Sequence, residues 1–165
     1  MKSWCIFCKT GSEKATAKFI TESDDNIKAI APIRILQEKR KGRWLYKEQV
    51  LFPGYVFIYA KDDIDFEMIR RVPGFYKLLG YDTIVKELQG SDYKYSMWIY
   101  KHQGTLETSK VLTIGSTVKV IEGPLLDGLG KIVKLDKHKR RIWVEFEFDG
   151  QLRTVSLSAE CVESR

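Results

Sequence analysis

The pattern of apolar residues predicts mixed structure in the first hundred residues. Residues 3–8 and 75–81 have the pattern of strands, and residues 54–60, apolar on both faces, have that of a central strand. Ala15, Phe19 and Ile20 recur at helical spacing, which predicts a helix over 12–21, and similar spacing predicts short helices over 65–71 and 92–101, the last capped by Ser91. We expect an α/β sandwich whose sheet is antiparallel or mixed.

The sequence around residues 39–43 predicts a β-hairpin, and the sequence after residue 112 predicts a set of short strands. Gly42 lies between two apolar flanks, so residues 39–43 predict a basic hairpin tip, and Pro32 marks an edge or a bend. After residue 112 the chain has strand patterns only, in five short segments: 116–121, 130–135, 140–148, 151–157 and 161–163. Residues 102–112 are polar and aperiodic, which is typical of a linker. The predicted class is α+β, with domains 1–101 and 113–165, the second a five-stranded SH3-like barrel.

Charge is concentrated at one predicted turn of the second domain. The chain of 165 residues has a net charge of +6, and residues 131–141 hold six Lys or Arg and one Asp, whereas residues 142–163 hold one Arg and five acids. Ile142, Val144, Phe146 and Phe148 alternate along the strand that follows, which orients them to one face. This distribution indicates an oriented anion-binding surface.

The sequence offers little for catalysis or metal binding. Phosphate-loop, zinc-protease and nucleophile-elbow motifs are missing, and the two histidines are far apart. Cys5 and Cys8 form a C-x-x-C, but in a strand these positions face opposite ways, so we expect buried thiols rather than a zinc or redox site. We therefore expect no enzyme activity, no metal and no cofactor.

No apolar run is long enough for a membrane span and no signal peptide is evident, so we expect a cytoplasmic protein.

Several motifs together carry a family resemblance. "EGPLLDGLGKIV" (122–133) resembles a KOW motif, the glycine-centred turn of small barrels in ribosomal and transcription proteins. "SWCIFCKTGSE", "FPGYVFI" and "IRRVPGFYKLLG" resemble successive signatures of the N-terminal domain of the NusG family, and the resemblance covers essentially the whole chain. The basic tail "LDKHKRRIWVEFEFDGQ" is most similar to the specialised LoaP branch. Cys5 and Leu125 replace the usual tyrosine and phenylalanine, which affects the expected packing.

The resemblance implies two partners for the first domain. An aromatic hollow is expected to dock on the clamp helices of RNA polymerase, and Phe52, Tyr55 and Phe57 match it, with Trp4 expected nearby. These aromatics could instead belong to the core, least so Tyr55, whose hydroxyl needs a polar neighbour. Arg70 and Arg71 match a position beside non-template or upstream DNA, with a solvated arginine pair as the alternative.

For the second domain the resemblance implies binding of a nascent RNA hairpin. The candidate contacts are cationic or aromatic: Lys131, Lys134, Lys137, His138, Lys139, Arg140, Arg141 and Trp143. Trp143 either stacks on an unpaired base or packs within the protein, and the tip at 39–43 is an alternative RNA site. We therefore expect a monomeric, operon-specific elongation and antitermination factor. The alternatives are a general NusG-like factor without an RNA address and a ribosome-associated KOW protein.

Overall fold

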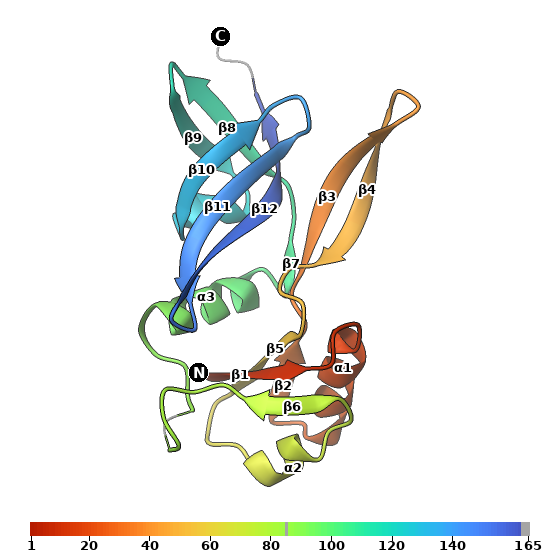
Figure 1. Cartoon of the computed structure of the whole chain (residues 1–165), viewed down its shortest axis with the longest axis vertical. Coiled ribbons are helices and arrows are strands. Elements are labelled where there is room, and N and C mark those ends of the chain that lie inside the picture. The colour runs from red at the N-terminus through yellow and green to blue at the C-terminus, as the bar shows by residue number, and fades with distance from the viewer. Residues whose placement is uncertain (85, 163–165) are drawn as a thin grey trace. The chain divides into compact units, whose positions relative to one another are not determined.

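The computed structural model describes residues 1–84 and 86–162. Its elements in chain order are β1 (Lys2–Cys8), α1 (Glu13–Ser23), β2 (Ile27–Ile30), β3 (Ile33–Arg40), β4 (Arg43–Val50), β5 (Tyr55–Ala60), α2 (Phe66–Arg70), β6 (Phe75–Leu78), α3 (Gly90–Lys101), β7 (Thr105–Leu106), β8 (Ser109–Ile114), β9 (Thr117–Glu122), the 3-10 helix η1 (Pro124–Asp127), β10 (Lys131–Asp136), β11 (Arg141–Phe148) and β12 (Gln151–Cys161) (Figure 1). The predicted α+β class is confirmed.

The chain forms two compact units, and each unit is built from two segments that are separated in the sequence. Unit 1 comprises residues 1–32 and 52–104, and unit 2 comprises residues 33–51 and 105–162. The β3–β4 hairpin therefore belongs by its contacts to the unit that contains the barrel. The chain leaves unit 1 at Pro32, the residue at which the sequence predicted an edge or a bend.

Unit 1 is a four-stranded sheet between two helical layers. Its strand order is β2-β5-β1-β6, and every pairing is antiparallel. The cluster on one face includes Ile6, Val56 and Ile58 from the strands, with Ile20 of α1 and Ile69 of α2 packed against them. The opposite face meets α3, where the Tyr59 hydroxyl donates to the Ser96 carbonyl at 2.6 Å. As predicted, β5 is central and covered on both faces.

Unit 2 contains a five-stranded sheet and the smaller sheet β4-β3-β7. The larger sheet has the order β10-β11-β12-β8-β9, in which β12 and β8 are parallel and the other pairs antiparallel. The row of Ile142, Val144, Phe146 and Phe148 lies in the barrel interior, each at most 5% exposed. This confirms the strand face that alternation predicted for β11.

The glycine-rich turn before β10 is tightly enclosed. Gly123 has φ +100°, and a Cβ atom there would lie 2.6 Å from the Ser109 backbone. The Leu125 amide donates to Ser109 Oγ at 3.1 Å, and the Leu125 side chain is buried. Leu125 therefore keeps the apolar anchor that the resemblance associates with a phenylalanine.

Three local predictions are corrected by the structure. The predicted linker 102–112 contains β7 and the start of β8, because these strands pair with β3 and β12 in a way that no local pattern announces. The barrel's fifth strand is accordingly β8, whereas Cys161 of the expected strand 161–163 ends β12 and Glu163 lies outside the described residues. Helix α3 begins one residue before Ser91, and its N-cap is Gln89, so Ser91 is not the cap.

Candidate functional site

Unit 1 presents an aromatic cluster on the α3 side of its sheet. Tyr55 and Phe57 point to this side because they alternate along β5 with the core residues Val56 and Ile58. Ring centroids of Phe52 lie 6.2 Å from Tyr55 and 6.5 Å from Phe57. Phe57 is fully buried and Phe52 is 4% exposed, whereas Tyr55 is half-buried. Of these three rings, Tyr55 is the one that a partner can reach.

Trp4 does not belong to this cluster. It is 1% exposed and lies in the core on the opposite face of the sheet, with its ring 6.3 Å from that of Phe66. Trp4 pairs in register with Ile58, so strand pairing does place it beside β5. The alternation of side chains then turns it away from Tyr55, which is why the expectation of a nearby Trp4 is corrected.

Two aromatic residues that sequence reasoning missed extend the cluster. Phe7 lies 5.5 Å from Tyr55 and 6.0 Å from Tyr76, measured between ring centroids. Tyr76 is 61% exposed, and Gly54 is packed so closely against Phe7 that a Cβ atom would lie 2.4 Å from its ring. The order β5-β1-β6 creates this row across three strands, and a single sequence does not reveal that order.

Arg70 and Arg71 are exposed at the end of α2. The Arg70 guanidinium lies 2.7 Å from a Glu67 carboxylate oxygen, one turn earlier in the helix. This exposed i,i+3 pair adds little stability. Both arginines are therefore accessible to an anionic partner.

In unit 2 the turn between β10 and β11 carries the predicted basic tip. Lys137, His138 and Lys139 are exposed there. The Lys139 amide donates to the Asp136 carboxylate at 3.0 Å, and this hydrogen bond lowers the pKa of Asp136. Lys137 Nζ lies 3.0 Å from Thr113 Oγ1 at the end of β8. The turn is thus internally organised while its two lysines and His138 are exposed to solvent.

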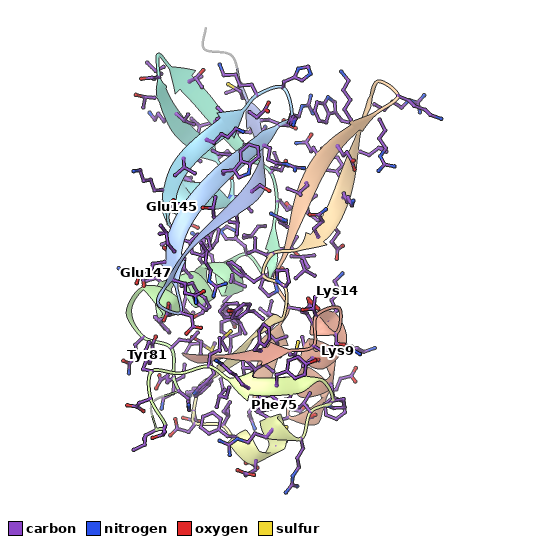
Figure 2. All side chains as sticks on the ribbon, in the orientation of Figure 1. Lys9, Lys14, Phe75, Tyr81, Glu145 and Glu147 are labelled. Atoms are coloured by element: carbon purple, nitrogen blue, oxygen red, sulfur yellow. The ribbon has the colours of Figure 1, made fainter. Side chains whose placement is uncertain are left out.

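Other candidate RNA contacts are spread along the strands. Lys134 Nζ lies 4.6 Å from the centre of the half-buried Trp143 ring, so one face of that ring already has a cation on it. Lys131 begins β10, roughly 17 Å from the turn at the rise of an extended strand. Glu145 and Glu147 follow β11 away from the turn (Figure 2). Positive charge therefore gathers at one end of the β10–β11 pair.

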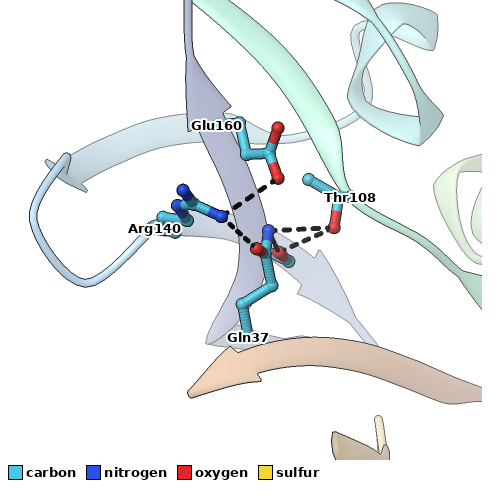
Figure 3. A network of polar contacts seen from close by, with 5 residues as sticks. Gln37, Thr108, Arg140 and Glu160 are labelled. Atoms are coloured by element: carbon cyan, nitrogen blue, oxygen red, sulfur yellow. Dashed lines mark hydrogen bonds and ion pairs between the residues drawn. The ribbon is translucent and has the colours of Figure 1, made fainter. Parts of the chain in front are cut away.

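Arg140 differs from its neighbours in the turn because it is held by several partners (Figure 3). Its Nη1 donates to Gln37 Oε1 at 2.8 Å and lies 3.5 Å from Glu160 Oε1. Its guanidinium carbon is 4.1 Å from the centre of the Trp44 ring. Gln37 Nε2 in turn donates to Ser158 Oγ at 3.0 Å. Arg140 thereby joins the β3–β4 hairpin to the barrel, a role that its place in a basic run does not indicate.

The described residues offer no assembled metal centre. No group of three or more His, Cys, Asp or Glu side chains that could hold an ion occurs in 1–84 or 86–162. Cys5 and Cys8 are both buried, on opposite faces of β1, and burial raises the pKa of the Cys8 thiol. A thiol with a raised pKa is a weak nucleophile at neutral pH.

Comparison with known proteins identifies the family. The family model described as "Transcription termination factor nusG" matches residues 2–95. The chain belongs to the NusG family. The NusG proteins of Rickettsia bellii and Helicobacter pylori strain 26695 are each 24% identical to it, over 95% and 99% of this chain and 87% and 98% of theirs. Both are named transcription termination/antitermination proteins.

A solved NusG structure supports the same fold. Thermotoga maritima NusG superimposes with a TM-score of 0.55 at 20% identity, covering 95% of this chain and 93% of that one. NusG-family proteins are transcription factors rather than enzymes. No helix in the described part of this chain is long and apolar enough to cross a membrane.

Proposed function

We propose that this NusG-family protein is an operon-specific elongation and antitermination factor that binds RNA polymerase and a structured leader RNA. The observation that carries the RNA assignment is the basic turn at the end of β10. Lys137 and Lys139, with His138 between them, are exposed on a turn braced by Asp136. A cation cluster of this kind suits the phosphates of an RNA hairpin, which proteins bind mainly through its shape and backbone. The similarity of this turn to the LoaP branch supports the assignment.

The aromatic cluster of unit 1 is the proposed surface for the polymerase clamp helices. Tyr55 supplies the accessible ring, while Phe52 and Phe57 form its buried support. Apolar anchors set in a well-packed patch carry most of the energy of a protein interface. Phe7 and Tyr76 extend the surface, and Trp4 contributes only to the core beneath it.

Two further contacts belong to this proposal. Arg70 and Arg71 are exposed. We propose that they lie beside the non-template strand or upstream DNA, where guanidinium groups attract phosphates. In the barrel, Lys134 and Trp143 extend the RNA surface along β10 and β11. Lys131 begins β10 and so adds a contact to a more distant phosphate, away from the turn.

Transcription with purified components tests the proposal. Polymerase is run through a terminator on templates with and without a leader hairpin, in the presence and absence of the full-length protein. We expect more read-through only on the template that encodes the hairpin. Equal effects on both templates would indicate a general NusG-like factor. Hairpin binding without any effect on polymerase would favour an RNA-binding protein outside transcription.

A further inference from the structure

Two basic tips line the same groove in unit 2. The groove has a volume of about 250 Å³. Lys39 and Trp44 line it from the β3–β4 hairpin, and His138, Lys139 and Arg141 line it from the barrel. The sequence offered the tips at 39–43 and 137–141 as alternative RNA sites. In the fold they are two sides of one surface.

The position of the hairpin beside the barrel is fixed by contacts within unit 2. Gln37 is 2% exposed, and it bonds both Ser158 of β12 and Arg140 of the turn (Figure 3). A second contact joins the same two strands, β3 and β12: Arg34 Nη1 donates to the Ser156 carbonyl at 2.6 Å. Because several of these bonds involve a neutral partner, added salt screens them less than it screens exposed ion pairs.

The electrostatics of the groove favour an anion. Lys39, Lys139 and Arg141 contribute positive charge to its lining. The acidic side chain in the described lining is Glu38, which lies 3.5 Å from Arg40. Because the cationic side chains of this lining outnumber its described carboxylate, the groove favours an oxygen-rich anion such as a phosphate.

We propose that the groove between the two tips binds the phosphodiester backbone of RNA, with contacts from Lys39 on one side and Lys139 and Arg141 on the other. The inference rests on the proposed function and deepens it by placing part of the RNA site on the β3–β4 hairpin. The volume is below the range of about 300–1,000 Å³ that encloses small ligands, which suits a backbone running through the groove. Trp44 is covered by Arg140, so it forms a wall of the groove and is not a free stacking platform.

Single-charge variants of the full-length protein test the two sides separately. Lys39→Gln and Lys139→Gln each remove one exposed cation from the groove. Lys47→Gln on β4 and Lys119→Gln on β9 are matched controls, since both lysines are exposed and neither lines the groove. Binding to the leader hairpin used in the transcription assay is measured between 50 and 200 mM salt. Both groove variants should flatten the logarithmic salt slope by roughly 0.7–0.9, and both controls should match the wild type.

The possible results distinguish a failure of the shared groove from a failure of the proposed RNA binding. If Lys139→Gln weakens binding and Lys39→Gln behaves as Lys47→Gln does, the barrel tip alone binds RNA and the shared groove is wrong. Loss with Lys39→Gln alone overturns it equally. If the wild-type protein does not bind the hairpin, the proposed RNA function itself fails. Tighter groove-dependent binding of poly-glutamate than of the hairpin would assign the groove to an acidic peptide and overturn the proposal.

A neutral substitution tests whether the hairpin must be held in place. Gln37→Ala removes the bonds to Arg140 and Ser158 without changing any charge. We expect it to lower RNA affinity about tenfold, with Gln151→Ala, an exposed residue at the β11–β12 turn, unchanged. Thermal unfolding confirms that both variants are folded at the assay temperature. Wild-type affinity in a folded Gln37→Ala protein would contradict a groove that depends on the docked hairpin.

Discussion

The aromatic cluster of unit 1 and the basic turn of unit 2 are built in opposite ways. Phe52 and Phe57 are almost fully buried, so the aromatic surface is the outer edge of a core. Lys137, His138 and Lys139 project from a turn whose own hydrogen bonds hold it. An apolar interface needs rigid support from the fold, whereas exposed cations attract phosphates wherever a stable turn carries them. Substitution of the buried rings should therefore damage folding in the first region, whereas substitution of the exposed lysines should damage binding in the second.

The largest expected effect is on the stability of unit 1. Phe57→Ala should lower the free energy of unfolding by about 3–5 kcal/mol, because it removes a fully buried ring from the sheet. Denaturant unfolding followed by tryptophan fluorescence measures this. His138→Ala, on the exposed turn, should change stability by less than about 0.5 kcal/mol. Similar losses in both variants would remove the contrast between the two regions.

A binding defect without loss of folding is expected at the exposed edge of the aromatic cluster. Tyr55→Ala should weaken binding to purified core RNA polymerase by about 1–3 kcal/mol, since the half-buried ring is the reachable anchor of the cluster. Surface plasmon resonance with immobilised polymerase measures the change. Tyr46→Ala, an exposed tyrosine on β4, is the control and should bind normally. Unchanged binding by a folded Tyr55→Ala protein would make Tyr55 purely structural.

Within the basic turn, one arginine should behave like a core residue. Arg140→Ala should cost about 1–3 kcal/mol of stability, because it breaks the bond to the buried Gln37 amide and the contact with Trp44. Lys139→Ala should leave stability within about 0.5 kcal/mol of the wild type. Chemical denaturation of both variants tests the difference. Equal stability of the two variants would mean that the contacts of the Arg140 side chain contribute no more to folding than those of Lys139.

The smallest expected effect is an acid-sensitive loosening of the turn. The hydrogen bond from the Lys139 amide lowers the pKa of Asp136 in the folded protein. A lowered pKa contributes stability above the unfolded-state value, and this contribution is lost as pH falls through the folded-state value. The Lys139 amide resonance should therefore shift in acid, below the ordinary Asp range, and the shift should vanish in Asp136→Asn. An Asp136→Asn protein with the same acid titration would contradict this account.

Much of the local structure could be predicted from the sequence. The central strand β5, the helix α1 and the alternating face of β11 follow from periodicity alone, because burial on one side imposes it. The polar segment 102–112 was the main local failure, since β7 and β8 gain their structure from distant partners. The aromatic cluster was half predicted: Phe52, Tyr55 and Phe57 are close in sequence, whereas Phe7 and Tyr76 join them only through strand order.

The order of residues along the chain is enough to predict the strand and turn pattern, the charge of the basic tip and the resemblance to the NusG family. Tertiary structure alone decided that Trp4 faces away from Tyr55 and that the hairpin at 39–43 joins the barrel rather than unit 1. It also decided that the Arg140 side chain is held by Gln37, Glu160 and Trp44, whereas the Lys139 side chain is exposed. Gln37 and Arg140 are 103 residues apart, so neither residue's neighbours in the sequence carry any sign of their hydrogen bond. Local periodicity records which side chains are buried, but pairing between distant side chains arises only when the chain has folded.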